Sequence, residues 1–242
     1  MRGTRLVVSG RREAELSRLG EELGVTAIPC DLANRSDLAR LAVTAVDAGA
    51  QILIANAGVP ASGLLGDLSP EEIDRMLEVN LRAPIALTRA LLPAMLDRGA
   101  GHLVFVSSLQ GKSAVPLSSV YSATKFGLRG FALALREDLH ATGVGASVVM
   151  PGFIRDAGMF ARTGYRLPPG VGTKSPADVA QAVIAAIDHD RAEIDVAPIT
   201  LRAGAAIASV APALSARVSR LLGSHRIAEG VVARQRGQND ER

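Results

Sequence analysis

Short runs rich in β-branched residues alternate with longer amphipathic stretches along most of this chain, and this alternation limits the folds open to it. The runs have the length of buried strands, and the stretches between them repeat apolar residues at helical spacing. This pattern is typical of βαβ units, in which crossover helices join parallel strands. We therefore expect an α/β fold with a parallel sheet. The predicted strands are Arg5–Ser9, Val25–Pro29, Gln51–Ala55, Gly101–Ser107, Gly145–Met150 and Glu193–Val196, and the predicted helices lie near Arg12–Leu23, Ser36–Ala48, Pro70–Asp97, Ser118–Thr142 and Ser175–His189.

A chain of 242 residues is long enough for one domain with a full hydrophobic core. We expect residues 1–198 to form that domain and residues 199–242 to pack on it as a helical, basic tail. The first half of the tail is apolar but interrupted by Gly204 and Pro212, and Arg residues follow from Arg217 onward. The favoured interpretation is a helix packed on the domain or at a subunit interface. The alternative is a contact with a membrane surface, which requires the Arg residues on one polar face.

The composition excludes several classes of protein. With 48% apolar and 21% charged residues, the chain has the make-up of a soluble globular protein and not of a disordered one. The net charge is only +3 and no basic stretch carries interleaved aromatic residues, so nucleic-acid binding is not expected. The single Cys30 fits a reducing compartment, and neither a signal peptide nor an apolar run of about 18 residues is seen. We expect a cytoplasmic enzyme without a metal site, because the four His residues lack ligand spacing.

Tyr121 and Lys125 stand four residues apart at the start of a helical run, and Ser108 lies thirteen residues before Tyr121. One helical turn separates the first two, so they share a face of the helix. A nearby ammonium group lowers the pKa of a tyrosine, normally about 10, and lets it exchange protons near neutral pH. The alternative is an ordinary surface pair, but a chain with two Tyr and three Lys rarely forms one by chance.

Several further motifs occur in a fixed order along the chain, each next to a predicted strand or inside a predicted helix. In chain order the set is Asn56–Ala57–Gly58, Asn80, Ser107–Ser108, Tyr121, Lys125 and Pro151–Gly152. From about residue 4 to about residue 196, the chain therefore resembles the classical short-chain dehydrogenases/reductases. The resemblance implies a doubly wound, Rossmann-like domain and an oxidoreductase that transfers a hydride between NAD(P) and a carbonyl or alcohol substrate.

The resemblance also assigns catalytic roles. Tyr121 would pass a proton to or from the substrate oxygen. Lys125 would lower the pKa of Tyr121 and bind the nicotinamide ribose, and Ser108 would hold the substrate oxygen against the tyrosine. Asn80 would support a water path to the lysine. The alternatives are an ordinary strand-end serine for Ser108, and a local kink or a helix cap for Asn80.

The residues after the first predicted strand bear on the choice of cofactor. Dinucleotide-binding folds that select NAD carry an acid there for the ribose 2′-hydroxyl, and those that select NADP use an Arg for the 2′-phosphate. Here Gly10 stands in the place of the acid and Arg11 follows it. Because a guanidinium binds phosphate bidentately, NADP(H) is favoured over NAD(H). The alternative is that Arg11 and Arg12 are solvated residues at a helix start.

Further cofactor contacts are implied at other strand ends. Asp31 and Leu32 match a pair that contacts adenine in the family, and the alternative for Asp31 is a plain helix cap. Asn56–Ala57–Gly58 forms a turn that lets the backbone approach the cofactor, and Gly58 suits a position that needs a positive φ.

The segment after the fifth predicted strand would complete the site. Pro151 and Gly152 would shape the nicotinamide end and Ile154 would offer a backbone contact, whereas Asp156 stands where the family often has Thr. The stretch Phe153–Val171 corresponds to the family's substrate lid and is rich in aromatic and large apolar residues. It suggests a hydrophobic substrate, the alternative being that these side chains only pack the loop.

One part of the family pattern is absent. Members begin with a strand, a Gly-rich turn and a helix, whereas Met1 leads almost directly into what corresponds to the second strand. We expect a truncation of roughly 25–30 residues, which leaves Arg5–Ser9 and Gln51–Ala55 with unpaired edges and an apolar slot between them. Either the functional protein carries this unit upstream, or the chain is a short form. A short form would borrow the strand from a partner or act as a catalytically silent binding or scaffold protein.

The expected partners also follow from the resemblance. The substrate would be a small-molecule carbonyl or alcohol. Members of the family commonly form homodimers and homotetramers through long helices. Pro70–Asp97 and Ser118–Thr142 are therefore candidate interface elements.

Overall fold

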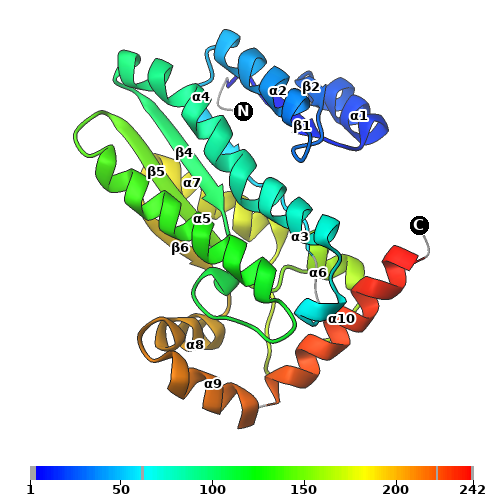
Figure 1. Cartoon of the computed structure of the whole chain (residues 1–242). Coiled ribbons are helices and arrows are strands. Elements are labelled where there is room, and N and C mark those ends of the chain that lie inside the picture. Colours follow the sequence, from blue (N-terminus) through cyan, green and yellow to red (C-terminus); the bar gives the residue numbers. More distant parts are fainter. Residues whose placement is uncertain (1–3, 61–62, 222, 241–242) are drawn as a thin grey trace.

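The computed structural model describes residues 4–60, 63–221 and 223–240, and in it helices flank parallel β-structure (Figure 1). The strands are β1 (Val7–Gly10), β2 (Thr26–Pro29), β3 (Ile52–Ala55), β4 (Gly101–Val106), β5 (Val144–Pro151) and β6 (Glu193–Val196). The helices are α1 (Glu13–Leu23), α2 (Arg35–Asp47), α3 (Pro70–Leu77), α4 (Ala83–Arg98), α5 (Ser119–Asp138), α6 (Gly158–Thr163), α7 (Pro176–Asp188), α8 (Ile199–Val210), α9 (Pro212–Leu221) and α10 (Ser224–Asp240), with the short turns η1 (Leu65–Asp67), η2 (Glu78–Arg82) and η3 (Leu109–Gly111). The predicted strands and helices are all present, which confirms the α/β fold with parallel strands.

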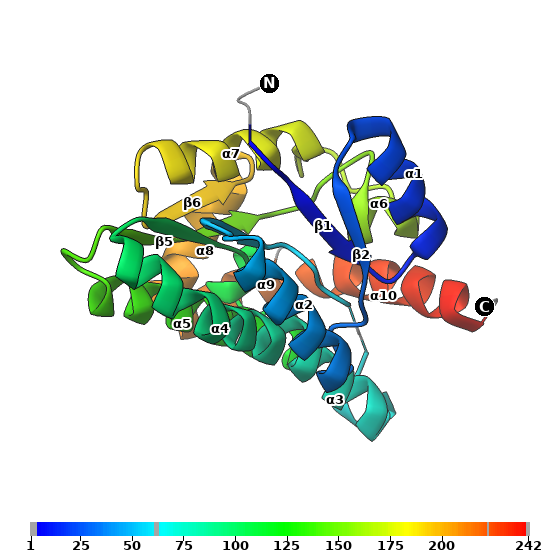
Figure 2. The ribbon, with the colours of Figure 1, turned by 90° about the horizontal axis from the view of Figure 1, so that it is seen from above.

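The strands form two separate sheets. β1 pairs with β2, with Val7 opposite Thr26, and the others follow the order β3-β4-β5-β6. Within the described residues no ladder joins β1 to β3, and Figure 2 shows β1 and β2 lying together beside α1. Leu6 and Val7 are 46% and 37% exposed, and Ile52 and Ile54 are 41% and 45% exposed. These are the two edges that we expected to be unpaired, and exposed backbone donors and acceptors remain along them.

Two helices begin as their sequences predict. The Ser69 side chain accepts a hydrogen bond from the Glu72 N–H at 3.2 Å, the Glu72 carboxylate accepts one from the Ser69 N–H at 2.9 Å, and Pro70 occupies the first position of α3. Ser175 and Asp178 form the same reciprocal cap on α7. These caps satisfy N–H groups that a helix start leaves without partners, and each stabilises its helix by about 1 kcal/mol.

The helix predicted over Pro70–Asp97 is interrupted by a π-helical turn. α3 leads into η2, a π-helical turn of five residues that contains the buried Asn80, and η2 leads into α4. α4 ends where Gly99 adopts a φ of 64°, a conformation that glycine takes without strain. Turns of the π type occur frequently at functional sites.

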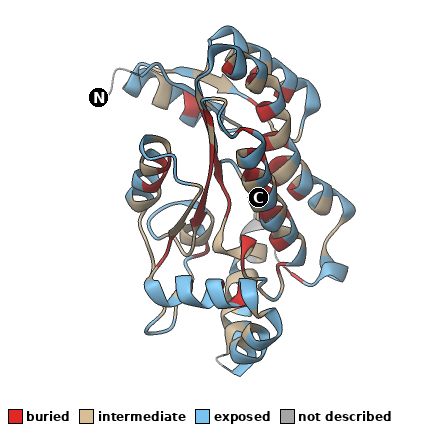
Figure 3. Ribbon diagram, turned by 90° about the vertical axis from the view of Figure 1, so that its left-hand side faces the viewer, coloured by how far each residue is buried: buried red, intermediate tan, exposed pale blue. Residues whose placement is uncertain are grey.

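The centre of the hydrophobic core lies on β4 and β5. Because side chains alternate along a strand, Leu103 and Phe105 pack in the cluster with α4 and α5, whereas Val104 and Val106 pack with α7. Phe105 meets Phe131 of α5 edge-on, with 5.4 Å between the ring centroids. Figure 3 shows buried residues concentrated along the strands and on the inner faces of the helices. Helices on both faces are what a parallel sheet requires.

The C-terminal residues form three helices. α8 continues through Gly204, and Pro212 occupies the first position of α9, where proline is tolerated. Ser209 of α8 donates a hydrogen bond to the Lys112 carbonyl at 3.4 Å, and α10 packs against α6 (Figure 1).

A domain boundary at residue 198 remains a prediction. In the described parts of the chain, no helix combines the length and the apolar character that crossing a bilayer requires.

Candidate active site

Three of the four predicted catalytic residues converge at the carboxyl end of β4. Ser108 follows this strand and begins η3, where its Oγ accepts a hydrogen bond from the Gln110 N–H at 3.1 Å. Tyr121 and Lys125 lie one turn apart near the start of α5, and Lys125 Nζ is 5.6 Å from the centroid of the Tyr121 ring. A side-chain hydrogen bond joins Ser108 to Tyr121. Open parallel sheets bind their ligands at this end of the strands.

Lys125 is almost wholly buried, with 2% exposure. Its Nζ donates a hydrogen bond to the Val106 carbonyl at 3.1 Å, and its own carbonyl accepts one from Ser107 Oγ at 2.9 Å. Burial disfavours the charged form and lowers the pKa of Lys125 to about 8. An ammonium group has three donors, of which the Val106 carbonyl takes one. Lys125 is therefore a buried ammonium group whose remaining N–H donors can form further hydrogen bonds.

The expectation that Lys125 lowers the pKa of Tyr121 is wrong for the chain without a cofactor. Burial of the phenol raises the pKa of Tyr121 to about 12, and the hydrogen bond from Ser108 offsets only part of this effect. The Lys125 ammonium group is bonded to the Val106 carbonyl and lies against the ring instead. Tyr121 is consequently protonated at neutral pH, a state that suits a proton donor and not a base.

Asn80 is completely buried in η2 and joins three segments of the chain. Its Oδ1 accepts a hydrogen bond from the Val59 N–H at 2.8 Å, and its Nδ2 donates to the Val59 carbonyl at 2.9 Å and to Thr124 Oγ1 at 3.3 Å. Asn80 caps no helix, so a local irregularity within a helix describes it better than a cap. The amide connects the loop after β3 to the turn of α5 that carries Lys125. A role in a water path stays a prediction.

Gly58 lies between Asn80 and Lys125. A Cβ added at Gly58 would sit 3.4 Å from Asn80 Oδ1 and 3.7 Å from Lys125 Nζ. Gly58 is not among the glycines with positive φ, so the expectation that its turn needs such a φ is wrong. The missing side chain instead keeps open the space beside the lysine. The preceding Asn56 and Ala57 are exposed at the end of β3.

The residues predicted to bind the adenosine end of the cofactor lie next to the two-stranded sheet. Arg11 follows β1 and is exposed, and Asp31 follows β2. Arg75 of α3 donates from Nη2 to both carboxylate oxygens of Asp31, at 3.1 and 2.9 Å. Burial alone would raise the pKa of Asp31, but the hydrogen bonds from Ala33 and Arg75, with the charges of Arg75 and Arg11, lower it. Asp31 does not cap a helix, because Asn34 caps α2. Nothing in the sequence pointed to Arg75.

The other predicted cofactor residues take part in packing and strand pairing. Leu32 packs against the core cluster of α2 and α4. Pro151 ends β5, Gly152 donates its N–H to the last residue of β6 at 3.0 Å, and Ile154 forms a β-bridge with Lys174. As cofactor contacts all of them remain predictions. The described residues contain no group of three or more His, Cys, Asp and Glu side chains suited to a metal ion.

The predicted lid contains helix α6. Phe153 and Phe160 pack with 4.8 Å between their ring centroids. The Cε atom of Met159 comes within 3.9 Å of a Cβ added at Gly58, which brings the lid close to the space beside Lys125. The lid therefore brings one apolar side chain, that of Met159, next to Gly58.

Helix α10 holds the lid, a contact that sequence reasoning missed. Arg234 Nη1 donates a hydrogen bond to the Gly164 carbonyl at 3.2 Å, directly after α6. Arg236 pairs with Asp67 of η1 at 3.5 Å, across 169 positions of the sequence. Figures 1 and 2 both show α10 running beside α6. Because these partners lie far apart along the chain, no local pattern could have revealed them.

Comparison with protein families matches residues 1–165 to short chain dehydrogenase. The chain is 37% identical over 223 residues to ketoacyl reductase HetN of Nostoc sp., covering 86% of this chain and 78% of the relative. It is 32% identical over 236 residues to dehydrogenase/reductase SDR family member 7B of Danio rerio, covering 89% and 76%. A short-chain dehydrogenase from Sphingobium yanoikuyae, solved in complex with NADPH, superposes with a TM-score of 0.73 at 27% identity, over 92% of this chain and 87% of that one.

Proposed function

Because the chain belongs to the short-chain dehydrogenase family of NAD(P)-dependent oxidoreductases, we propose that it transfers a hydride between a nicotinamide cofactor and a carbonyl or alcohol, with Ser108, Tyr121 and Lys125 as its catalytic residues. The observation that carries the proposal is the buried Lys125 one turn from a tyrosine that is hydrogen-bonded to Ser108. An ordinary surface pair leaves its ammonium group in water. A buried lysine destabilises the fold, so its presence at this position favours a role in the chemistry.

The residues around Lys125 fit the nicotinamide ribose. The ammonium group has donors beyond the one used by Val106, and a ribose offers hydroxyl oxygens as acceptors. Gly58 places no side chain beside it, and even a Cβ there would come within 3.7 Å of Lys125 Nζ. Pro151 and Gly152 end the neighbouring strand β5 and would border the nicotinamide ring. When bound, the nicotinamide supplies or accepts the hydride.

The protonated Tyr121 suits the reductive direction. As the carbonyl carbon accepts the hydride, the phenol donates its proton to the carbonyl oxygen, and the product is an alcohol. Ser108 holds the same oxygen by a hydrogen bond. The hydrogen bond from Ser108, which favours the phenolate, offsets part of the cost of the charge left on Tyr121. The relative named ketoacyl reductase carries a name that implies carbonyl reduction, which supports this direction.

NADPH is the cofactor that the charges favour. Arg11 is exposed directly after β1, where a 2′-phosphate on the adenosine ribose would need a cation. The neighbouring Asp31 carboxylate is already bound by Arg75. Gly10 offers no carboxylate to a ribose 2′-hydroxyl, and Arg11 keeps the guanidinium that a phosphate would bind.

The lid favours a hydrophobic substrate. Phe153, Met159 and Phe160 gather around α6, and Met159 reaches toward Gly58. A carbonyl flanked by apolar groups would bury them against these side chains, and each fully buried CH₂ contributes about 0.8 kcal/mol. A panel of ketones and aldehydes of increasing chain length tests this expectation through kcat/KM. A preference for small polar carbonyls would contradict it.

The proposed reaction is tested by Tyr121→Phe, which removes one hydroxyl and keeps the ring. Turnover of ketones with NADPH should fall by at least a factor of about 100, whereas the Kd for NADPH, measured by fluorescence titration, should change little. Tyr165→Phe is the matched control, since it removes the only other tyrosine hydroxyl and should leave the candidate active site intact. Retained turnover in Tyr121→Phe would remove this residue from the mechanism.

A catalytically silent binding protein is the second candidate. The two separate sheets favour it, because the space between β1 and β3 interrupts the surface on which a dinucleotide would lie. The same fluorescence titration separates the two candidates. A folded chain that binds neither NADPH nor NADH would support the silent form, and micromolar binding followed by ketone turnover would support the enzyme.

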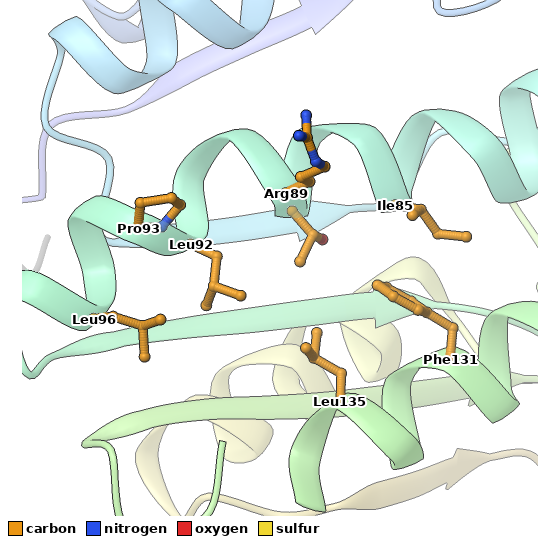
Figure 4. A pocket seen from close by; sticks show the side chains of 8 residues that line it. Ile85, Arg89, Leu92, Pro93, Leu96, Phe131 and Leu135 are labelled. Atoms are coloured by element: carbon orange, nitrogen blue, oxygen red, sulfur yellow. The ribbon is translucent and has the colours of Figure 1, made fainter. Parts of the chain in front are cut away.

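We further propose homodimers or homotetramers that form through α4 and α5. These helices enclose an apolar hollow of about 340 Å³ that includes Ile85, Leu92 and Phe131 (Figure 4). Leu96 at the end of α4 and Phe126 on α5 are also exposed. Light scattering on the purified protein measures the assembly, and a monomer at micromolar concentration would contradict this proposal.

A further inference from the structure

Helices α8 and α9 carry large apolar side chains that the rest of the protein leaves exposed. On α8, Ile199 is 72% and Val210 is 87% exposed. On α9, Leu214 is 56% and Leu221 is 87% exposed, and Val218 lies between them at 44%. We refer to these five residues as the C-terminal apolar face. Helices α8 and α9 lie in the lower part of Figure 3, where most residues are coloured as exposed, in contrast to the buried strands.

The spacing of these residues directs them away from the protein. Leu214, Val218 and Leu221 follow one another at intervals of four and three residues, which places them on one face of α9. The half-buried Ser215 and Ser219 lie on a neighbouring side of the helix. α9 therefore turns a polar side toward the protein and leaves its apolar residues exposed.

Helix α8 has the same arrangement. Ile199 and Val210 are eleven residues apart, close to three full turns, and share a face. Ala205 and Ala208 are buried on the opposite side. The small Ala205 and Ala208 face the body of the protein, whereas Ile199 and Val210 are left outside.

The charged residues of α8, α9 and the first residues of α10 all have one sign. No Asp or Glu occurs between Asp195 and Glu229, whereas Arg202, Arg217, Arg220 and Arg226 lie in that interval. On α9 the helical spacing places Arg217 and Arg220 along one border of the apolar residues. Long Arg side chains at such a border can extend to a charged surface while their stems cover apolar groups.

From this combination we propose that α8 and α9 bind the surface of an anionic lipid bilayer, with the C-terminal apolar face inserted among the headgroups. Exposed apolar residues bordered by Arg match a helix that lies in the membrane interface. Each Arg near an anionic surface contributes about a fivefold increase in binding. The proposal goes beyond the reaction and is independent of it, because none of these residues belongs to the candidate active site.

A second copy of this chain fits the same face poorly. In a twofold interface a patch meets itself, so the Arg residues of both copies would lie together. The segment supplies no carboxylate to compensate them. Lipid phosphate and serine carboxylate groups supply the negative charge that the segment lacks.

The test is flotation of the full chain with phosphatidylcholine vesicles, with and without phosphatidylserine. The parent protein should float with the anionic vesicles, bind the neutral ones weakly, and lose binding as salt is raised. Leu214→Ser/Val218→Ser/Leu221→Ser should abolish flotation. Arg217→Glu/Arg220→Glu should weaken binding by roughly 25-fold or more.

Matched controls carry the same changes at exposed positions elsewhere on the protein. Leu23→Ser/Val43→Ser/Ile184→Ser removes the same number of exposed apolar side chains, and Arg18→Glu/Arg191→Glu makes the same change in charge. Both controls should float as the parent does, and circular dichroism should show every variant to be folded.

Three outcomes would overturn the proposal. One is that the parent fails to bind anionic vesicles at low salt, and another is that the controls lose binding as much as the α9 variants. The third is that the serine variant dissociates an oligomer, seen by sedimentation, while vesicle binding persists, which would assign the face to contacts between copies.

Discussion

Replacing Lys125 with methionine should stabilise the protein while it abolishes turnover. Burial lowers the pKa of Lys125 from 10.5 to about 8, which corresponds to roughly 3 kcal/mol for holding the charged form in the interior at pH 7. Methionine has a similar length and no charge. The variant loses the hydrogen bond to the Val106 carbonyl, and a buried carbonyl without a partner costs about 1–2 kcal/mol. The free energy of unfolding should therefore rise by about 1–2 kcal/mol.

The sign of the pH dependence follows from the same pKa. It is lower in the folded than in the unfolded chain, so between pH 8 and pH 10.5 the unfolded chain binds more protons at Lys125. The parent protein gains stability as the pH rises through this window, whereas Lys125→Met does not. Below about pH 8 the lysine is charged in both the folded and the unfolded chain. The gain in the free energy of unfolding of Lys125→Met over the parent is then constant and largest. Toward pH 10.5 this gain disappears.

Urea unfolding followed by circular dichroism, at pH 7 and again near pH 10, measures this difference. Lys174→Met is the matched control, because the Lys174 side chain is 40% exposed and pairs loosely with Asp178 at 3.8 Å. Its free energy of unfolding should change by no more than about 0.5 kcal/mol. A Lys125→Met protein that is no more stable than the parent at pH 7, or whose advantage persists near pH 10, would refute the reasoning.

In the cofactor-free Tyr165→Phe protein, Tyr121 is the remaining tyrosine, and its tyrosinate absorbance should appear only near pH 12. Asn80→Ala leaves the partly buried N–H and carbonyl of Val59 without the Asn80 amide and should destabilise the fold by about 2–4 kcal/mol in urea unfolding. Arg11→Ala removes the proposed phosphate ligand and should weaken NADPH binding by roughly tenfold or more, with NADH binding unchanged in the same fluorescence titration.

Each of these predictions has a control variant or a result that would contradict it. Ionisation of Tyr121 below pH 10 would mean that Lys125 does lower its pKa. Asn56→Ala changes an exposed Asn at the end of β3 and should cost less than about 0.5 kcal/mol; a similar small loss in Asn80→Ala would contradict the role of its hydrogen bonds. Arg12→Ala should leave cofactor binding as it is, since Arg12 pairs with Glu15 on α1. Equal weakening of NADPH and NADH by Arg11→Ala would remove the phosphate argument.

Local signals were enough for the elements of the fold. β6 spans Glu193–Val196 as predicted, and α3 and α7 begin at the capping serines Ser69 and Ser175. Strand alternation, helical periodicity and helix caps each depend on residues a few positions apart. These signals can therefore be recognised in the sequence without knowledge of the tertiary structure. The same holds for Tyr121 and Lys125, because four residues on a helix are one turn. The resemblance to a known family then placed Ser108 beside them.

Long-range contacts decided the rest. The π-helical turn at Asn80 depends on bonds to Val59, the Asp31 carboxylate is held by Arg75 from 44 positions away, and the lid is held by Arg234 of α10. Whether a residue is buried is also a property of the assembled structure. The sequence by itself determined which residues could carry the chemistry and on which elements they lie. Only the tertiary structure decided their charge states and partners, because desolvation and hydrogen bonding depend on what surrounds a side chain and not on its neighbours along the chain.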